Sequence, residues 1–140
     1  MGYKRVSIKQ AIDFHGHLGP YLILGILAGE LAQRKLKAKR YFGIEVKVWG
    51  ASSKPKSCLI DGLQLSTGAT YGKGNIRRFN GNKIKILISD SSNKAHVLIM
   101  LKNRLIECLK DLKGHEDSEG FARKLYKLKP MDIFEFKAEN

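Results

Sequence analysis

The stretch FHGHLGP, residues 14–20, separates two helical patterns and places two imidazoles in the turn between them. Upstream, a serine and a glutamine three residues apart form a capping box, which predicts a short helix over residues 8–14. Glycines then break that helix, and Pro20 suits the first position of a second helix because its missing N–H needs no partner there. The pattern therefore leaves His15 and His17 in a turn between two helices.

The second helix is predicted over residues 20–36, where leucines recur with helical spacing. Gly25 and Gly29 form a G-x-x-x-G step on this helix. Small residues at this spacing let another helix approach closely. We therefore expect close helix packing at this step, either within the chain or across a dimer.

Strands are indicated in two further regions. Residues 43–50 alternate apolar and polar side chains, as a half-buried strand does. Residues 76–79 and 83–89 flank an Asn-Gly-Asn segment at 80–82. Because Asn-Gly is the strongest short hairpin signal, these two segments are predicted to form a β-hairpin.

The remaining patterns are helical, apart from a closing strand. Helices are predicted over residues 59–67, 94–112 and 118–128, with Cys108 buried in the apolar face of the longest, and a strand over 133–137. This order predicts an α+β fold with helices layered on a mixed β-sheet. A length of 140 residues fits a single domain, 1–140.

Composition and charge narrow the class of protein. The chain carries 26 Lys and Arg against 13 Asp and Glu, a formal net charge of +13 that favours anionic partners. The lysines are scattered and no stacking aromatics interleave with arginine, which disfavours nucleic acid as the partner. No signal peptide or membrane-length apolar run is present, so we expect a cytoplasmic protein without membrane contact.

A second polar segment, SCLIDG at residues 57–62, supplies a thiol and a carboxylate. Imidazole and thiolate together are typical ligands of zinc, with iron or another transition metal as alternatives. We therefore interpret His15, His17 and Cys58 as candidate ligands. Asp61 is either a further oxygen ligand or the acceptor for an imidazole N–H. The alternative is that both histidines are turn residues satisfied by backbone groups.

A nucleophile is the competing interpretation of the same cysteine. Cys58 precedes a predicted helix, where the helix N-terminus lowers a thiol pKa, and a histidine would act as its base. Under either interpretation, His96 and His115 are taken as ordinary surface or helix-end histidines.

Glycines recur over residues 68–74, in the sequence GATYGKG. This segment departs from the phosphate-binding loop of nucleotide hydrolases in both glycine spacing and the final hydroxyl residue. A weaker interpretation is an anion cradle formed by Gly72, Lys73 and Gly74. The alternative is a flexible connection to the next strand.

Two blocks of the chain resemble the FmdE/FwdE-like family, named after the E component of formylmethanofuran dehydrogenase. Residues 14–20, with Gly25 downstream, resemble the family opening F-H-G-H-x-C-P-G. Residues 58–64 and 67–75 resemble its second block, C-x-x-D-[AG]-[IL]-Q followed by T-G-C-T-x-G-K-G-N. The order of the blocks is that of the family's core domain, without the C-terminal zinc ribbon of longer members.

The resemblance implies an α+β fold similar to the catalytic domain of glyceraldehyde-3-phosphate dehydrogenase, often as a homodimer. It also implies a metal site, with zinc as the expected ion. The expected ligands are His17 and Cys58, then His15, and the residues expected around them or lining the pocket are Asp61, Gln64, Thr67 and Lys73.

In function, the resemblance implies an accessory subunit of a molybdenum or tungsten oxidoreductase, related to carbon dioxide reduction in methanogenic archaea. Enzymatic activity in this chain stays open. One alternative is a stand-alone enzyme on a small anionic substrate, using Cys58 or a metal-bound water. The other is a basic interaction module for nucleic acid or an acidic protein partner.

The chain departs from the family pattern at three positions. Gly19 and Ala69 stand where the family has cysteine, so a cysteine-rich centre at those places is excluded. Tyr21 replaces the glycine that follows the proline and is expected to narrow the pocket.

Overall fold

The computed structural model describes residues 4–140 and is built around one five-stranded mixed β-sheet. The strands lie in the order β2-β1-β3-β4-β5, with β1 parallel to β2 and every other neighbouring pair antiparallel. They are β1 (Ile44–Trp49), β2 (Ile76–Phe79), β3 (Lys85–Asp90), β4 (His96–Leu101) and β5 (Phe134–Glu139). This confirms the α+β class and the mixed sheet.

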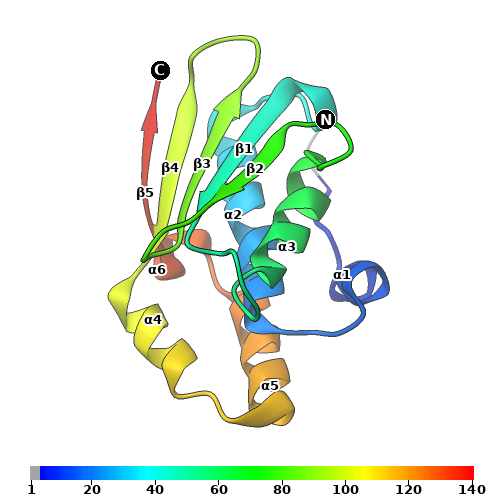
Figure 1. Ribbon diagram of the computed structural model, residues 1–140, viewed down its shortest axis with the longest axis vertical. Helices are drawn as coiled ribbons and strands as arrows, with labels where there is room; N and C mark the ends of the chain where they lie inside the picture. The colour runs from blue at the N-terminus through cyan, green and yellow to red at the C-terminus, as the bar shows by residue number, and fades with distance from the viewer. Residues whose placement is uncertain (1–3) are drawn as a thin grey trace.

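The helices form a layer against the sheet and extend beyond it (Figure 1). The apolar helix α2 contacts β3 and β4, while α3 and α5 pack against α2. The helical elements are α1 (Ile8–His15), α2 (Pro20–Leu36), the 3-10 turn η1 (Tyr41–Gly43), α3 (Cys58–Thr67), α4 (Asn103–Lys110), α5 (Gly114–Lys127) and α6 (Pro130–Ile133). Buried side chains from the sheet and from α2, α3 and α5 join in one hydrophobic core.

The capping box and turn that begin the chain are confirmed. The Ser7 hydroxyl accepts from the Gln10 backbone N–H at 3.0 Å, and the Gln10 side chain accepts from the Ser7 N–H at 2.8 Å. Gly16 ends α1 in a left-handed conformation, φ +99°, which a side chain would strain. Pro20 then opens α2 as predicted.

Helices α2 and α3 pack with their backbones in contact. A Cβ on Gly25 would overlap the Leu59 carbonyl oxygen, and a Cβ on Gly62 would overlap the Leu22 carbonyl oxygen. A Cβ on Gly29 would overlap the Ser66 hydroxyl. The G-x-x-x-G step therefore serves packing within the chain.

The predicted hairpin is wrong. Strands β2 and β3 both pair with β1, which lies between them, so residues 80–82 cross the end of β1. A Cβ on Gly81 would lie 3.2 Å from the Gly50 nitrogen and 3.2 Å from the Trp49 Cβ, so this crossing is tight. The Asn-Gly pair marks a turn correctly, but its local signal carries no information about which strand comes next in the sheet.

The predicted helix over residues 94–112 is also wrong. Its first half is strand β4, in which Val97, Ile99 and Leu101 are buried, and its second half is the short helix α4. A run that is apolar on both faces fits a central strand as well as a helix, and pairing with β3 and β5 decides the outcome. Cys108, predicted to be buried, is exposed because the real helix packs on a different face.

The last predicted helix is confirmed but longer, since α5 begins at Gly114. The closing strand is confirmed as β5, which follows the short helix α6.

A clasp links the segment before α1 to helix α5. The Tyr126 hydroxyl donates to the Val6 carbonyl oxygen at 2.6 Å. Arg5 stacks over the Tyr126 ring at 3.9 Å and pairs with Glu30, a carboxylate buried on α2, at 3.0 Å. These contacts give the buried charge of Glu30 a partner.

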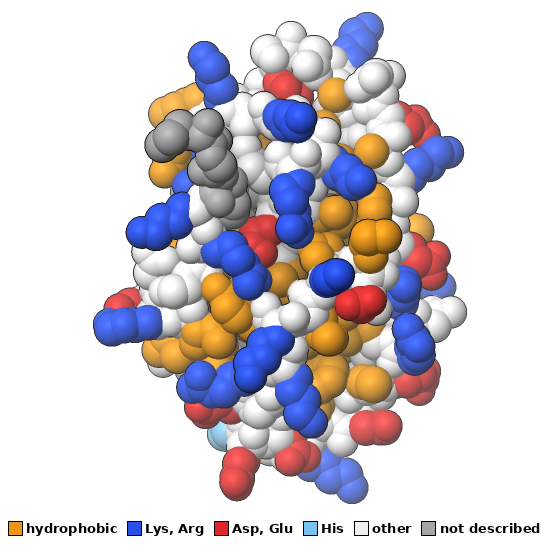
Figure 2. Space-filling model, turned by 180° about the vertical axis from the view of Figure 1, so that it is seen from behind, with side chains coloured by type: hydrophobic (Ala, Val, Ile, Leu, Met, Phe, Trp, Pro, Cys, Tyr) orange, Lys and Arg blue, Asp and Glu red, His pale blue; other side chains and the backbone are white. Residues whose placement is uncertain are grey.

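Charge is spread over the surface. Figure 2 shows Lys and Arg side chains distributed over one face, with acidic and hydrophobic side chains between them. Across residues 4–140, none of the helices combines the length and apolarity that crossing a bilayer requires.

Candidate metal centre

Three side chains with metal-binding chemistry meet where α1, α2 and α3 begin or end. His15 is the last residue of α1, His17 follows the left-handed Gly16, and Cys58 is the first residue of α3. One ligand atom from each of the three residues lies within 4.8 Å of the others. The two imidazole rings are 4.6 Å apart between centroids. The turn thus lets two histidines two positions apart face the same cysteine.

Asp61 fixes the orientation of one imidazole. His15 Nδ1 lies 2.6 Å from Asp61 Oδ2, so the ring donates its Nδ1 proton to the carboxylate. The other oxygen of Asp61 accepts from the Gln64 side-chain amide at 3.3 Å, and Gln64 accepts from the Tyr71 backbone N–H at 3.2 Å. A carboxylate behind an imidazole in this way is typical of metal-bound histidine.

The far nitrogen of His15 is the least explained polar atom of this region. His15 Nε2 is buried and has no hydrogen-bond partner among residues 4–140. With Nδ1 protonated, Nε2 presents a lone pair to the space shared with His17 and Cys58. A buried polar atom without a partner is costly unless a ligand satisfies it. The two nitrogens and one sulfur therefore fit a transition-metal ion of the zinc class.

Burial controls the protonation of the other two candidate ligands. Desolvation, followed by the charges of His15, His115 and Lys54, lowers the pKa of His17, so its imidazole is neutral at pH 7. Desolvation first, and then the Asp61 carboxylate, raises the pKa of Cys58. The prediction of a lowered thiol pKa at this helix start is therefore wrong. The free thiol is a weak nucleophile.

A cavity of about 250 Å³ opens beside these ligands. His17 and Cys58 line it, together with Tyr21 from α2 and with His115 and Ser118 from the first turns of α5. His115 was interpreted from the sequence as an ordinary histidine. Its place in the cavity depends on the packing of α5 against α2, which no local pattern in the sequence reveals.

Comparison with known proteins agrees with this geometry. Residues 14–135 match the family model described as FmdE, molybdenum formylmethanofuran dehydrogenase operon. The chain belongs to the FmdE family. The match contains all three candidate ligands and confirms the resemblance that the two sequence blocks carry.

One solved structure shares the fold of this FmdE-family chain. It is an FmdE-like protein of the tungsten formylmethanofuran dehydrogenase from Syntrophus aciditrophicus, with a TM-score of 0.67 and 21% identity. The match covers 95% of this chain and 70% of that one.

A relative from Archaeoglobus fulgidus, named a probable S-adenosyl-L-methionine-binding protein, is 30% identical over 76 residues. The match covers 49% of this chain and 19% of the relative, so the shared part is about a fifth of that protein.

The two lost FmdE cysteines occupy different environments. A Cβ on Gly19 would lie 3.6 Å from His17 Nε2, and Gly19 has extended backbone angles that any residue adopts. Ala69 is fully buried beyond the end of α3 and does not line the cavity. Position 19 is therefore next to the candidate ligands, whereas position 69 belongs to the core.

Several residues expected near the site lie elsewhere. The Thr67 hydroxyl is buried, donates to the Leu63 carbonyl oxygen at 2.7 Å and accepts from the Ala69 N–H at 3.1 Å, so it secures the end of α3. The Lys73 ammonium lies 5.6 Å from the ring centroids of Tyr41 and of Phe42, at the turn η1.

The glycine-rich segment does not share the cavity of the ligands. Among the residues that the structure describes, Gly72, Lys73 and Gly74 are absent from the lining of that cavity, which corrects the expectation of a common cleft. Within the segment, the Lys73 N–H donates to the Thr70 hydroxyl at 3.1 Å, as in an ordinary turn.

Proposed function

We propose that this FmdE-family chain binds one transition-metal ion, with zinc as the best fit, through His15, His17 and Cys58. The observation that carries the proposal is the buried, unpartnered Nε2 of His15, held by Asp61 beside two further donor atoms. The neutral imidazole of His17 supports it, because a metal requires the deprotonated nitrogen.

Three protein ligands leave room for a fourth ligand on the side of the cavity. Structural zinc sites have four protein ligands, whereas catalytic sites keep one position for water or substrate. When bound, the ion would supply Lewis acidity to a group in that position. His17, His115 and Tyr21 would line the space around such a group and supply hydrogen bonds to it. This arrangement supports, as a second candidate, a stand-alone enzyme acting on a small anionic substrate.

Family membership supports a place beside a molybdenum or tungsten oxidoreductase in the cytoplasm, as part of the same proposal. A homodimer is also part of the proposal. Because Gly25 and Gly29 are used in packing α2 on α3, a dimer would use another surface. The name of the Archaeoglobus fulgidus relative transfers no ligand to this chain, since the match covers 19% of that protein.

The test is elemental analysis of the protein and of matched variants. We expect about one zinc ion per chain in the wild type and none in Cys58→Ser or His17→Ala. Cys108→Ser is the control, because this second thiol is exposed on α4 and should leave the metal content unchanged. Co²⁺ added to metal-free protein should give a thiolate-to-metal absorption band that only the Cys58 variant loses. Full metal content in Cys58→Ser would refute the proposal.

A further inference from the structure

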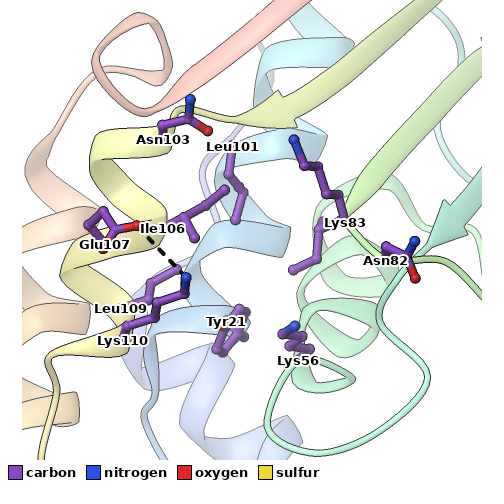
Figure 3. Close-up of a pocket in the computed structure, with 11 residues that line it drawn as sticks. Tyr21, Lys56, Asn82, Lys83, Leu101, Asn103, Ile106, Glu107, Leu109 and Lys110 are labelled. Atoms are coloured by element: carbon purple, nitrogen blue, oxygen red, sulfur yellow. Dashed lines mark ion pairs between the residues drawn. The ribbon is translucent and has the colours of Figure 1, made fainter.

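A second, larger cavity lies beside the first and contains none of the candidate metal ligands. Its volume is about 320 Å³, at the lower end of the range for small-molecule sites. It is enclosed by α4, by the start of α2, and by the two loops that carry Lys56 and Lys83 (Figure 3). The crossing of residues 80–82 over β1 is what brings the second loop opposite α4.

The floor of this cavity is apolar. Ile84 and Leu101 are 8% and 7% exposed, and Ile106 and Leu109 of α4 are half-buried beside them. Apolar side chains that line a concave surface favour a ligand with an apolar body, since covering them removes apolar area from water.

The rim of the cavity is positively charged. Lys110 pairs with Glu107 at 3.8 Å on one wall, on α4. On the opposite wall, Lys56 and Lys83 form no ion pair with any residue from 4 to 140. Two ammonium groups on separate loops therefore face one apolar floor without a carboxylate to compensate them.

Tyr21 connects this cavity to the candidate metal centre. It lines both cavities, and its hydroxyl forms no hydrogen bond within the part of the chain that the structure describes. Desolvation raises its pKa, so the phenol keeps its proton and can donate. Figure 3 shows the ring between Lys110 and Lys56.

We propose that this cavity binds a small organic carboxylate with an apolar body. Its carboxylate would accept charge-assisted hydrogen bonds from Lys56 and Lys83, and its body would cover Ile84, Leu101 and Ile106. The Tyr21 hydroxyl would donate to a polar atom at the end nearer the metal centre. This inference goes beyond the proposed metal binding and does not depend on it, because no candidate metal ligand lines the cavity.

Calorimetric titration with 2-naphthoate tests the proposal, with 2-naphthamide as a neutral probe of the same shape and acetate as a carboxylate without the body. We expect naphthoate to bind and both other probes to bind at least about tenfold more weakly. The double variant Lys56→Gln/Lys83→Gln should weaken naphthoate binding by a similar factor. The control Lys94→Gln/Lys124→Gln removes the same charge from exposed sites outside both cavities and should bind like the wild type.

Three outcomes would overturn the proposal. They are no naphthoate binding at millimolar concentration, equal binding of naphthoate and naphthamide, and undiminished binding in the Lys56/Lys83 variant. Cys58→Ser separates this proposal from the metal centre. Naphthoate binding should survive that substitution, and its loss would place the probe at the metal centre instead.

Discussion

Replacing Gly25 with alanine should destabilise the protein, although alanine is the better helix former. The added methyl would overlap the Leu59 carbonyl oxygen and crowd the Gly62 Cα and Leu63 nitrogen, all of them backbone atoms of α3. Backbone atoms cannot rotate away, so α2 and α3 must separate. Overpacking of this kind costs about 1–3 kcal/mol, and contact with backbone favours the upper end. Alanine returns about 1 kcal/mol of helix propensity, which leaves a net loss of about 2 kcal/mol.

Gly120→Ala is the matched control for this prediction. Gly120 lies on the exposed side of α5, and a Cβ there meets nothing within 4 Å. The same substitution should therefore stabilise the protein by about 1 kcal/mol. Urea unfolding of metal-free protein, analysed by linear extrapolation, measures both changes. If Gly25→Ala is as stable as Gly120→Ala, the close contact between α2 and α3 is not real.

Three further predictions concern the metal centre and one loop. Gly19→Cys places a thiol beside His17 and should raise zinc affinity in a chelator competition; unchanged affinity would show that position 19 does not reach the ion. Asp61→Asn should weaken zinc binding about 10- to 100-fold by releasing the His15 ring, whereas an effect below about twofold would contradict that role. In the loop after β3, hydrogen bonds from the following serine, its hydroxyl foremost, lower the pKa of Asp90. Its contribution to stability should be complete above the unfolded-state pKa of about 4 and disappear as pH falls through the lower folded-state value. Asp90→Asn should remove that part of the pH dependence, and parallel stability curves for the two proteins would refute it.

The early part of the fold follows from local signals in the sequence. The capping box at Ser7, the left-handed turn at Gly16 and Pro20 at a helix start act within a few residues, so the boundaries of α1 and α2 were predicted closely. The errors after residue 75 share a different cause. Whether residues 96–101 form a helix or a strand is decided by β3 and β5 on either side, and such pairing is not encoded locally.

The same division holds for the site. His15, His17 and Cys58 were predicted from their chemistry and from the family resemblance, and the structure brings them together. His115 was missed because it reaches the cavity through α5, more than fifty residues after Cys58. Lys73 was placed in the wrong cleft because a glycine-rich pattern states that the backbone can turn and leaves the direction open.

The clasp between Val6 and Tyr126 has a consequence for the order of folding. Its partners are 120 residues apart in the chain, so their hydrogen bond cannot form during synthesis until residue 126 has left the ribosome. All three candidate ligands are made long before that point. The segment that holds them would therefore wait, incompletely covered, for α5 to arrive and be fastened by Tyr126. Contacts of such long sequence separation are slow to form, so this fastening is a natural late step in maturation.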